Sequence, residues 1–144
     1  MQGINKPATH NPAWELERSM PRGPIYIVED DENLVDAFSA GLKAHGFEVA
    51  VQDCVFGAAA RIRELRASVV ILDIGLPYRP GTALLDELKR DPRTANLPVL
   101  VISGMAEMLS AERRALANRV LTKPFRLDTL VDAISSLCAG ERVA

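Results

Sequence analysis

The sequence predicts an α/β domain built as a doubly wound, five-stranded parallel sheet with helices on both faces. Five short apolar runs, rich in β-branched residues, alternate with longer segments whose apolar residues recur at helical spacing. Continuous apolar runs are typical of strands buried on both faces, and strand–helix alternation favours right-handed crossovers between parallel strands. The expected strands are 25–28, 47–51, 69–73, 99–102 and 120–122.

Helix signals follow each of these strands in order. Asp31 is expected to cap the first helix and Gly46 to end it. Asp53 is the candidate cap of the second helix, and Ser110 is the candidate cap of the fourth, which extends through Ala117. The apolar positions that mark the second, third and last helices are Phe56, Ile62 and Leu65, then Leu84, Leu85 and Leu88, then Leu127, Leu130, Val131, Ile134 and Leu137.

Composition limits the size of the domain and the class of its partners. The chain has 144 residues, 48% of them hydrophobic, and a formal net charge of −2. This length suits one domain with its own core, and the near-neutral charge gives no electrostatic attraction to nucleic acid or to an anionic membrane. Cys54 and Cys138 lie in apolar surroundings without the spacing of metal ligands, which favours two reduced, buried thiols and a cytoplasmic location.

The folded domain is expected over residues 24–140. Residues 1–23 hold several prolines and show no sheet pattern, so we expect a mobile N-terminal extension. Trp14, the only tryptophan, offers the alternative that this extension docks on the domain. Residues 141–144 form a short C-terminal tail, and no output domain is expected after it.

Polar residues stand at the carboxyl ends of four of the expected strands. Glu29 and Asp30 follow the first strand, Asp73 ends the third, Ser103 follows the fourth and Lys123 follows the fifth. In open α/β sheets, ligands bind beyond the carboxyl ends of the strands. An acidic pocket that also holds a hydroxyl and an ammonium is suited to a divalent cation and a phosphoryl group.

Each of these residues also has a simpler interpretation. Mg²⁺ prefers oxygen ligands, and Glu29, Asp30 and Asp73 would supply three carboxylates. The first two could instead be acids placed favourably at a helix N-terminus. Serine is common in loops, so Ser103 need not bind a ligand. Lys123 could be an ordinary surface lysine, or its ammonium could pair with Asp73 and with phosphoryl oxygens.

The order of these blocks resembles the receiver domain of two-component response regulators. The matching stretches are Ile-Val-Glu29-Asp30-Asp31-Glu, Val-Val-Ile-Leu-Asp73-Ile-Gly-Leu-Pro77, Gly81, Val-Leu-Val-Ile-Ser103-Gly and Leu-Thr-Lys123-Pro124-Phe125. The resemblance extends over residues 25–139. It implies a flavodoxin-like fold with strand order 2-1-3-4-5 and a cis peptide bond between Lys123 and Pro124.

The resemblance also implies a role for each site residue. Asp73 would accept the phosphoryl group, Lys123 would contact that group, and Ser103 would supply the switch hydroxyl. The implied ligands of Mg²⁺ are Asp30 directly, Glu29 through water, Asp73, and the carbonyl of Gly75.

The implied partners are a phosphoryl donor and a downstream protein. The donor would be a sensor histidine kinase or a histidine phosphotransfer protein. The downstream protein, or a second copy of the chain in a homodimer, would use the face formed by the fourth helix, the fifth strand and the last helix. Two features depart from the family: Val120 stands where the switch aromatic is usual, and the segment 103–123 is shorter than usual.

The leading hypothesis is a stand-alone receiver that acts as a signalling switch or phosphorelay carrier, with no enzymatic activity beyond self-phosphorylation and slow self-dephosphorylation. Slow hydrolysis is expected because Gly75 and Met105 occupy the positions that usually approach the attacking water, and neither side chain can polarise it.

Two alternatives stay open. One is a haloacid-dehalogenase-like, Mg²⁺-dependent phosphatase, although Gly75 stands where that family has a second acid. The other is a degenerate receiver that serves only as an interaction module.

Overall fold

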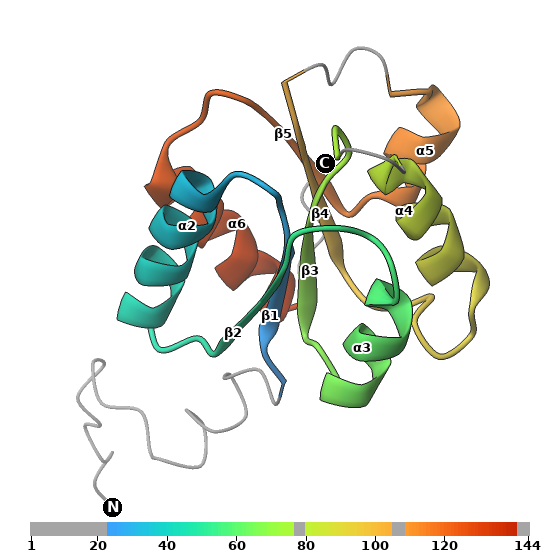
Figure 1. Ribbon diagram of the computed structural model, residues 1–144, viewed down its shortest axis with the longest axis horizontal. Coiled ribbons are helices and arrows are strands. Elements are labelled where there is room, and N and C mark those ends of the chain that lie inside the picture. The colour runs from blue at the N-terminus through green and yellow to red at the C-terminus, as the bar shows by residue number, and fades with distance from the viewer. Residues whose placement is uncertain (1–22, 77–79, 105–108, 141–144) are drawn as a thin grey trace, which may run out of the picture.

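The computed structural model describes residues 23–76, 80–104 and 109–140, and it has the predicted architecture. Five parallel strands form one sheet in the order β2-β1-β3-β4-β5 (Figure 1). The strands are β1 (Ile25–Val28), β2 (Val49–Gln52), β3 (Val69–Asp73), β4 (Val99–Ser103) and β5 (Arg119–Thr122). The helices are α2 (Glu32–Ala44), α3 (Ala58–Leu65), α4 (Gly81–Arg90), α5 (Ala111–Leu116) and α6 (Leu127–Cys138).

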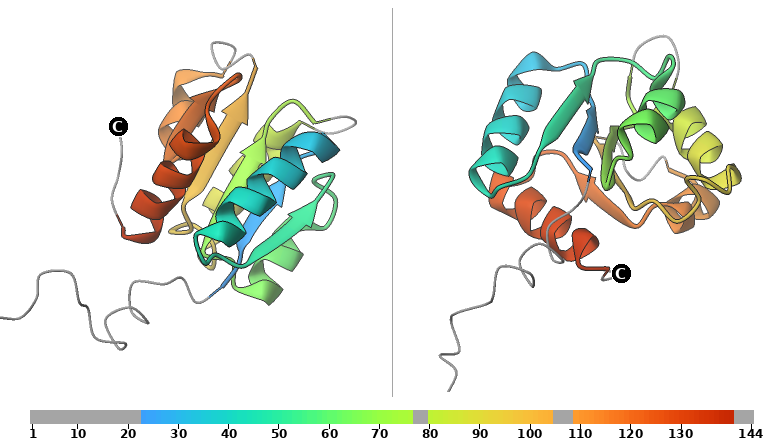
Figure 2. Two further views of the ribbon diagram at one scale, coloured as in Figure 1. Left: turned by 90° about the vertical axis from the view of Figure 1, so that its left-hand side faces the viewer. Right: turned by 90° about the horizontal axis from the view of Figure 1, so that it is seen from below.

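The sheet separates two hydrophobic cores, one on each face. Helices α2 and α6 cover one face, and α3, α4 and α5 lie on the other (Figures 1 and 2). Successive strand residues alternate between the two cores, so Ile25 packs on the α2–α6 side and Tyr26 on the α3–α4 side. All residues of β1, β3 and β4 are buried, as their continuous apolar runs predict.

Several predicted helix ends are confirmed by the structure. The Asp31 side chain accepts hydrogen bonds from the backbone amides of Asn33 and Leu34 and so caps α2. Gly46 follows α2 with a φ of 87°, a left-handed conformation that suits glycine. Ser110 caps α5 through the amide of Arg113 at 3.2 Å.

The expected start of the second helix was wrong. Helix α3 begins at Ala58, after Gly57 in the left-handed conformation, so Asp53 does not cap it. Phe56, expected on the apolar side of this helix, lies in the preceding loop with 58% of its surface exposed. The reason is local: the Gln52 side chain donates a 2.6 Å hydrogen bond to the carbonyl of Phe56 and holds this residue in the loop.

The second strand also begins later than predicted. Its expected first residue, Phe47, donates its backbone amide to the carbonyl of Leu42 and so belongs to the turn that ends α2. Pairing with β1 begins at Val49.

The predicted extension, including Trp14, and the predicted tail of residues 141–144 lie outside the described residues, except for Gly23. No helix within the described ranges is long and apolar enough to cross a membrane.

A close contact between the start of α4 and the end of β3 sets the position of Asp73. The amide of Gly81 donates to the carbonyl of Ile74 at 3.2 Å, which brings the start of α4 against the strand end. A Cβ atom on Gly81 would lie 2.4 Å from the carbonyl oxygen of Asp73 and 2.7 Å from the Cα of Ile74. Only a residue without a side chain therefore fits between this helix and the strand.

We predict that Gly81→Ala destabilises the domain by about 1–3 kcal/mol, because the backbone must shift to admit the methyl group. Urea unfolding would measure the change in free energy. Gly104→Ala is the matched control, since a Cβ there meets no atom within 4 Å. Equal stabilities of the two variants would contradict the packing argument.

Candidate metal and phosphoryl site

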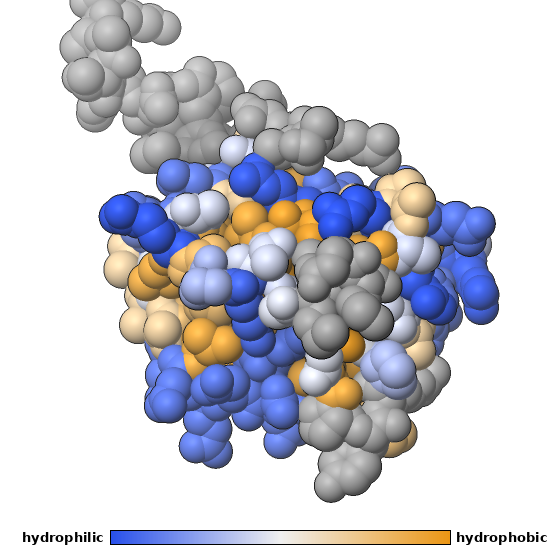
Figure 3. Space-filling view, turned by 90° about the horizontal axis from the view of Figure 1, so that it is seen from above, coloured by the Kyte–Doolittle hydropathy of each residue, from blue (hydrophilic) through white to orange (hydrophobic). Residues whose placement is uncertain are grey.

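The strand ends bring the predicted site residues to the carboxyl edge of the sheet. Glu29 and Asp30 follow β1, Asp73 ends β3, Ser103 ends β4, and Lys123 follows β5. Parallel pairing of β1 with β3, of β3 with β4, and of β4 with β5 makes these ends neighbours. Seen from above, the face that includes this edge carries both hydrophilic and hydrophobic residues (Figure 3).

Lys123 lies between two buried carboxylates. Its Nζ is 2.9 Å from Oδ2 of Asp73 and 3.2 Å from Oε2 of Glu29. The expected pairing of Lys123 with Asp73 is therefore present, and the Lys123–Pro124 peptide bond is cis, as predicted. The backbone amide of Lys123 also donates to the carbonyl of Ser103 at 2.8 Å, which fixes this residue to β4.

Backbone amides bind the oxygen of each carboxylate that Lys123 does not contact. The amide of Asp31 donates to Oε1 of Glu29 at 3.1 Å, and the amide of Gly75 donates to Oδ1 of Asp73 at 2.8 Å. The second contact was not predicted, although aspartate commonly accepts from the amide two residues onward. The two carboxylates, with 1% and 5% of their residues' surfaces exposed, are thus fixed in place before any ligand binds.

The site carries more negative charge than one ammonium can neutralise. Burial raises the pKa of Glu29 to about 7, and the neighbouring carboxylate of Asp73 adds to the rise, while the Asp31 amide and Lys123 oppose it. Burial alone would lower the pKa of Lys123, but the hydrogen bonds and charges of Asp73 and Glu29 raise it. The protonated lysine and the crowded carboxylates together favour an added cation.

Glu29, Asp30 and Asp73 form the candidate cation site. One carboxylate oxygen from each lies within 4.8 Å of those of the other two. Three oxygen donors, one of them on the exposed Asp30, fit Mg²⁺, which takes few protein ligands and keeps several waters. Asp31, by contrast, uses its carboxylate to cap α2.

The remaining predicted residues surround this centre. Ser103 is buried at the end of β4, opposite Thr122 of β5, and its polar groups have partners. Val120, at the position expected for a switch aromatic, is half-buried and packs against the core on the α3–α4 side. Met105 lies outside the described residues.

Comparison with known proteins gives one family. The family described as "Response regulator receiver domain" matches residues 25–135. The DNA-binding dual master transcriptional regulator RpaA of Synechocystis is 31% identical over 121 residues, which cover 82% of this chain and 49% of RpaA. Protein PilH of Pseudomonas aeruginosa is 28% identical over 118 residues, covering 81% of this chain and 98% of PilH. The chain spans about half the length, or less, of the other relatives compared, which are transcriptional regulators.

Solved structures share the fold. A CheY-like receiver domain protein from Methanospirillum hungatei superposes with a TM-score of 0.71 at 23% identity, covering 82% of this chain and 94% of that one. The response regulator TrrA of Thermotoga maritima, solved in complex with Mg²⁺-BeF, gives a TM-score of 0.72 at 20% identity, covering 80% of this chain and 98% of TrrA.

We predict that Mg²⁺ affinity depends on Asp30 and not on Asp31. Asp30→Ala should weaken binding at least tenfold, given that even outer-shell partners of a metal typically contribute about 10–100-fold. Asp31→Ala should cost about 1 kcal/mol of stability through the lost helix cap and leave Mg²⁺ binding unchanged. Mg²⁺ titration by calorimetry and urea unfolding of both variants would test this. A reversed pattern would shift the site by one residue along the chain.

Proposed function

Because the chain belongs to the response regulator receiver family, which serves as a phosphoacceptor in signalling, we propose that Asp73 is the residue that accepts the phosphoryl group. The donor would be a phosphohistidine on a sensor histidine kinase or a histidine phosphotransfer protein. One observation carries the assignment: the carboxylate of Asp73 is buried at the centre of the acidic site, with Lys123 on one oxygen and the Gly75 amide on the other.

This geometry prepares the carboxylate for in-line attack. A carboxylate oxygen of Asp73 would bond to phosphorus while the bond from phosphorus to the imidazole nitrogen breaks, its electron pair leaving with that nitrogen. Lys123 would then exchange its contact with the carboxylate for one with the phosphoryl oxygens, where the negative charge has moved. Its pairing with Glu29 keeps the ammonium protonated and in place during this exchange.

A bound Mg²⁺ would neutralise charge on the phosphoryl oxygens and on the acids around them. We propose that Asp30 ligates it directly, Glu29 through water, and Asp73 and the carbonyl of Gly75 complete the protein ligands. The clustered carboxylates support this set, as does TrrA, which was solved with Mg²⁺-BeF. Without a metal, the pKa of Glu29 is about 7, so its carboxyl group is partly protonated at neutral pH. The cation would keep this group ionised.

The output side of the function is proposed from the same edge of the sheet. Ser103 would contact the phosphoryl group through its hydroxyl, and β4 would carry this change toward β5. A downstream protein, or a second copy of the chain in a homodimer, would read the face formed by α5, β5 and α6. RpaA is a DNA-binding regulator, but for this domain, with its net charge of −2, we propose no direct contact with nucleic acid.

Receiver domains are generally non-catalytic signalling domains, and we propose no turnover here beyond self-phosphorylation and slow self-dephosphorylation. We also propose that the domain works in the cytoplasm. Cys54 and Cys138 support a reducing compartment, since both are unpaired; they are half-buried, less buried than the sequence predicted.

We predict that Asp73→Asn abolishes phosphoryl uptake and leaves the fold intact, because the amide keeps the shape of the carboxylate and loses its nucleophilic charge. The measurement is intact-protein mass after incubation with acetyl phosphate and Mg²⁺. Asp53→Asn, which changes an exposed acid after β2, should label like the unmodified sequence. Labelling of the Asp73 variant would refute the assignment, and turnover of a phosphomonoester by the unmodified protein would point to a phosphatase.

We predict slow loss of the phosphoryl group, because no side chain at position 75 can hold a water opposite the leaving carboxylate. A Cβ at this position would lie 3.4 Å from Oδ1 of Asp73, so Gly75→Asn can place an amide beside the phosphoryl group. This variant should dephosphorylate several-fold faster than Gly75→Ala, which fills the same space without a polar group. Decay of labelled protein after removal of acetyl phosphate measures both rates, and equal rates would exclude the explanation.

A further inference from the structure

A basic groove lies on the α3–α4 side, beside the start of β1. It has a volume of about 780 Å³ and runs between α3 and the loop after α4. Small and apolar residues, among them Ala67 and Leu97, line it together with three arginines, Arg63, Arg66 and Arg93, and one acid, Glu64. Its lining therefore carries an excess of positive charge, in contrast to the acidic site at the carboxyl ends of the strands.

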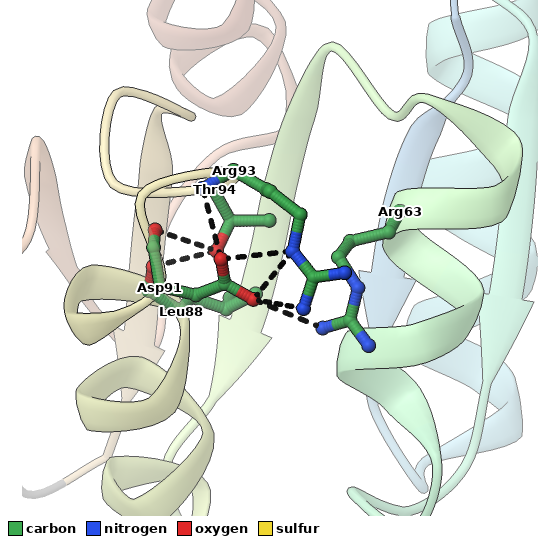
Figure 4. Close-up of polar contacts among 5 residues, drawn as sticks. All are labelled: Arg63, Leu88, Asp91, Arg93 and Thr94. Atoms are coloured by element: carbon green, nitrogen blue, oxygen red, sulfur yellow. Dashed lines mark hydrogen bonds and ion pairs between the residues drawn. The ribbon is translucent and has the colours of Figure 1, made fainter.

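Two of the arginines are held in place by one aspartate. Nη2 of Arg93 lies 2.8 Å from Oδ2 of Asp91, and Nη1 of Arg63 lies 3.4 Å from the same oxygen. Figure 4 shows both guanidinium groups directed at this carboxylate, from α3 and from the loop after α4. Hydrogen bonds from Arg93, supported by the charges of Arg93 and Arg63, lower the pKa of Asp91 to about 2. Asp91 thus pairs with two guanidinium groups, so its single negative charge neutralises only one of their two positive charges.

The third arginine faces solvent where the N-terminal extension leaves the domain. Arg66 is exposed, and across the described ranges its guanidinium has neither a hydrogen bond nor an ion pair. A Cβ on Gly23 would lie 1.7 Å from the carbonyl oxygen of Arg66. Gly23 is tied there through Ser68, whose Oγ accepts from the amide of Gly23 at 3.1 Å and donates to its carbonyl at 2.9 Å. The extension therefore starts at the rim of the groove.

The extension has a segment that complements this groove. Trp14, Glu15, Leu16 and Glu17 follow one another, and the two glutamates are the only acids among residues 1–22, whose basic residues are Lys6, Arg18 and Arg22. The acidic charge is thus confined to the four-residue segment that begins at Trp14. In an extended chain, alternate side chains point to opposite sides, so Trp14 and Leu16 would share one side and the glutamates the other. The eight residues between Trp14 and Gly23 give nine Cα–Cα steps, which can span up to roughly 30 Å and so allow the segment to fold back onto the groove.

We propose that Trp14–Glu17 docks intramolecularly in the groove between α3 and the loop after α4. Trp14 and Leu16 cover its apolar lining, and Glu15 and Glu17 pair with the arginines at its rim. A tether of this length gives an effective concentration in the millimolar range, so even a weak contact stays largely occupied. The indole can also stack on a guanidinium, a favourable arrangement for tryptophan and arginine.

Trp14 itself reports on the proposal, because it is the only tryptophan of the chain. In the folded protein, we expect its emission maximum at shorter wavelength than in the urea-unfolded protein. We also expect weaker quenching by acrylamide than in a free peptide of residues 1–22. Arg66→Glu should lower the ratio of docked to undocked extension by about fivefold or more, the upper range for loss of one exposed ion pair. Trp14 quenched as readily as in the free peptide would overturn the proposal.

Two controls separate docking from general charge effects. Lys43→Glu makes the same charge change on an exposed residue of α2, on the other face of the sheet, and should leave Trp14 protected. Adding Glu17→Arg to Arg66→Glu should restore part of the protection. Equal loss in the Arg66 and Lys43 variants would overturn the proposal. Protection that disappears on dilution would also overturn it, because the groove would then hold the extension of a second copy.

Discussion

The position of the half-buried Lys123 between the buried carboxylates of Asp73 and Glu29 is the interaction on which the site depends. Two carboxylates with almost no exposed surface would repel each other strongly if the ammonium were absent. Removing one partner from a buried ion pair typically costs about 3–5 kcal/mol, because an unpaired charge remains. One ammonium still leaves a negative excess around Asp73, Glu29 and Asp30. The same contacts that hold the folded site together therefore make it receptive to a cation and to phosphoryl transfer.

The parallel sheet supplies the precision that this arrangement requires. The three central strands are buried on both faces, so their positions are fixed by packing from two cores rather than by the polar contacts at their ends. Backbone contacts then set the last residues: Gly81 seats α4 against the end of β3, and the Lys123 amide joins the end of β4. The functional side chains extend from this rigid edge, which is why a charged cluster can be maintained beside a fully apolar core.

The sequence predicted the parts of the structure that follow from long-range burial. The apolar runs located all five strands. The polar residues after them lie together at one edge of the sheet, as expected, because the ends of parallel strands converge whatever the loops do. Predictions failed where local hydrogen bonds decided the outcome. The Gln52 side chain holds Phe56 in a loop, and Gly57 precedes the first residue of α3 where Asp53 was the expected cap. The amide of Phe47 is used by the turn after α2. The amide contact of Gly75 with Asp73 was also missed, although its two-residue spacing is a known pattern.

The near-neutral net charge conceals a separation of charge within the domain. Acids gather at the carboxyl ends of the strands, whereas arginines line the groove beside the start of β1. Helix α4 connects the two regions: its first residue packs against Asp73, and the residue after its last turn, Asp91, pairs with Arg63 and Arg93. A helix of ten residues is about 15 Å long. Phosphorylation can therefore affect the groove only if α4 has two positions. The acidic site must favour one of these positions over the other, and so must the groove. Comparing Trp14 quenching with and without a phosphoryl group on Asp73 would measure that coupling directly, and an unchanged signal would establish that the two regions act independently.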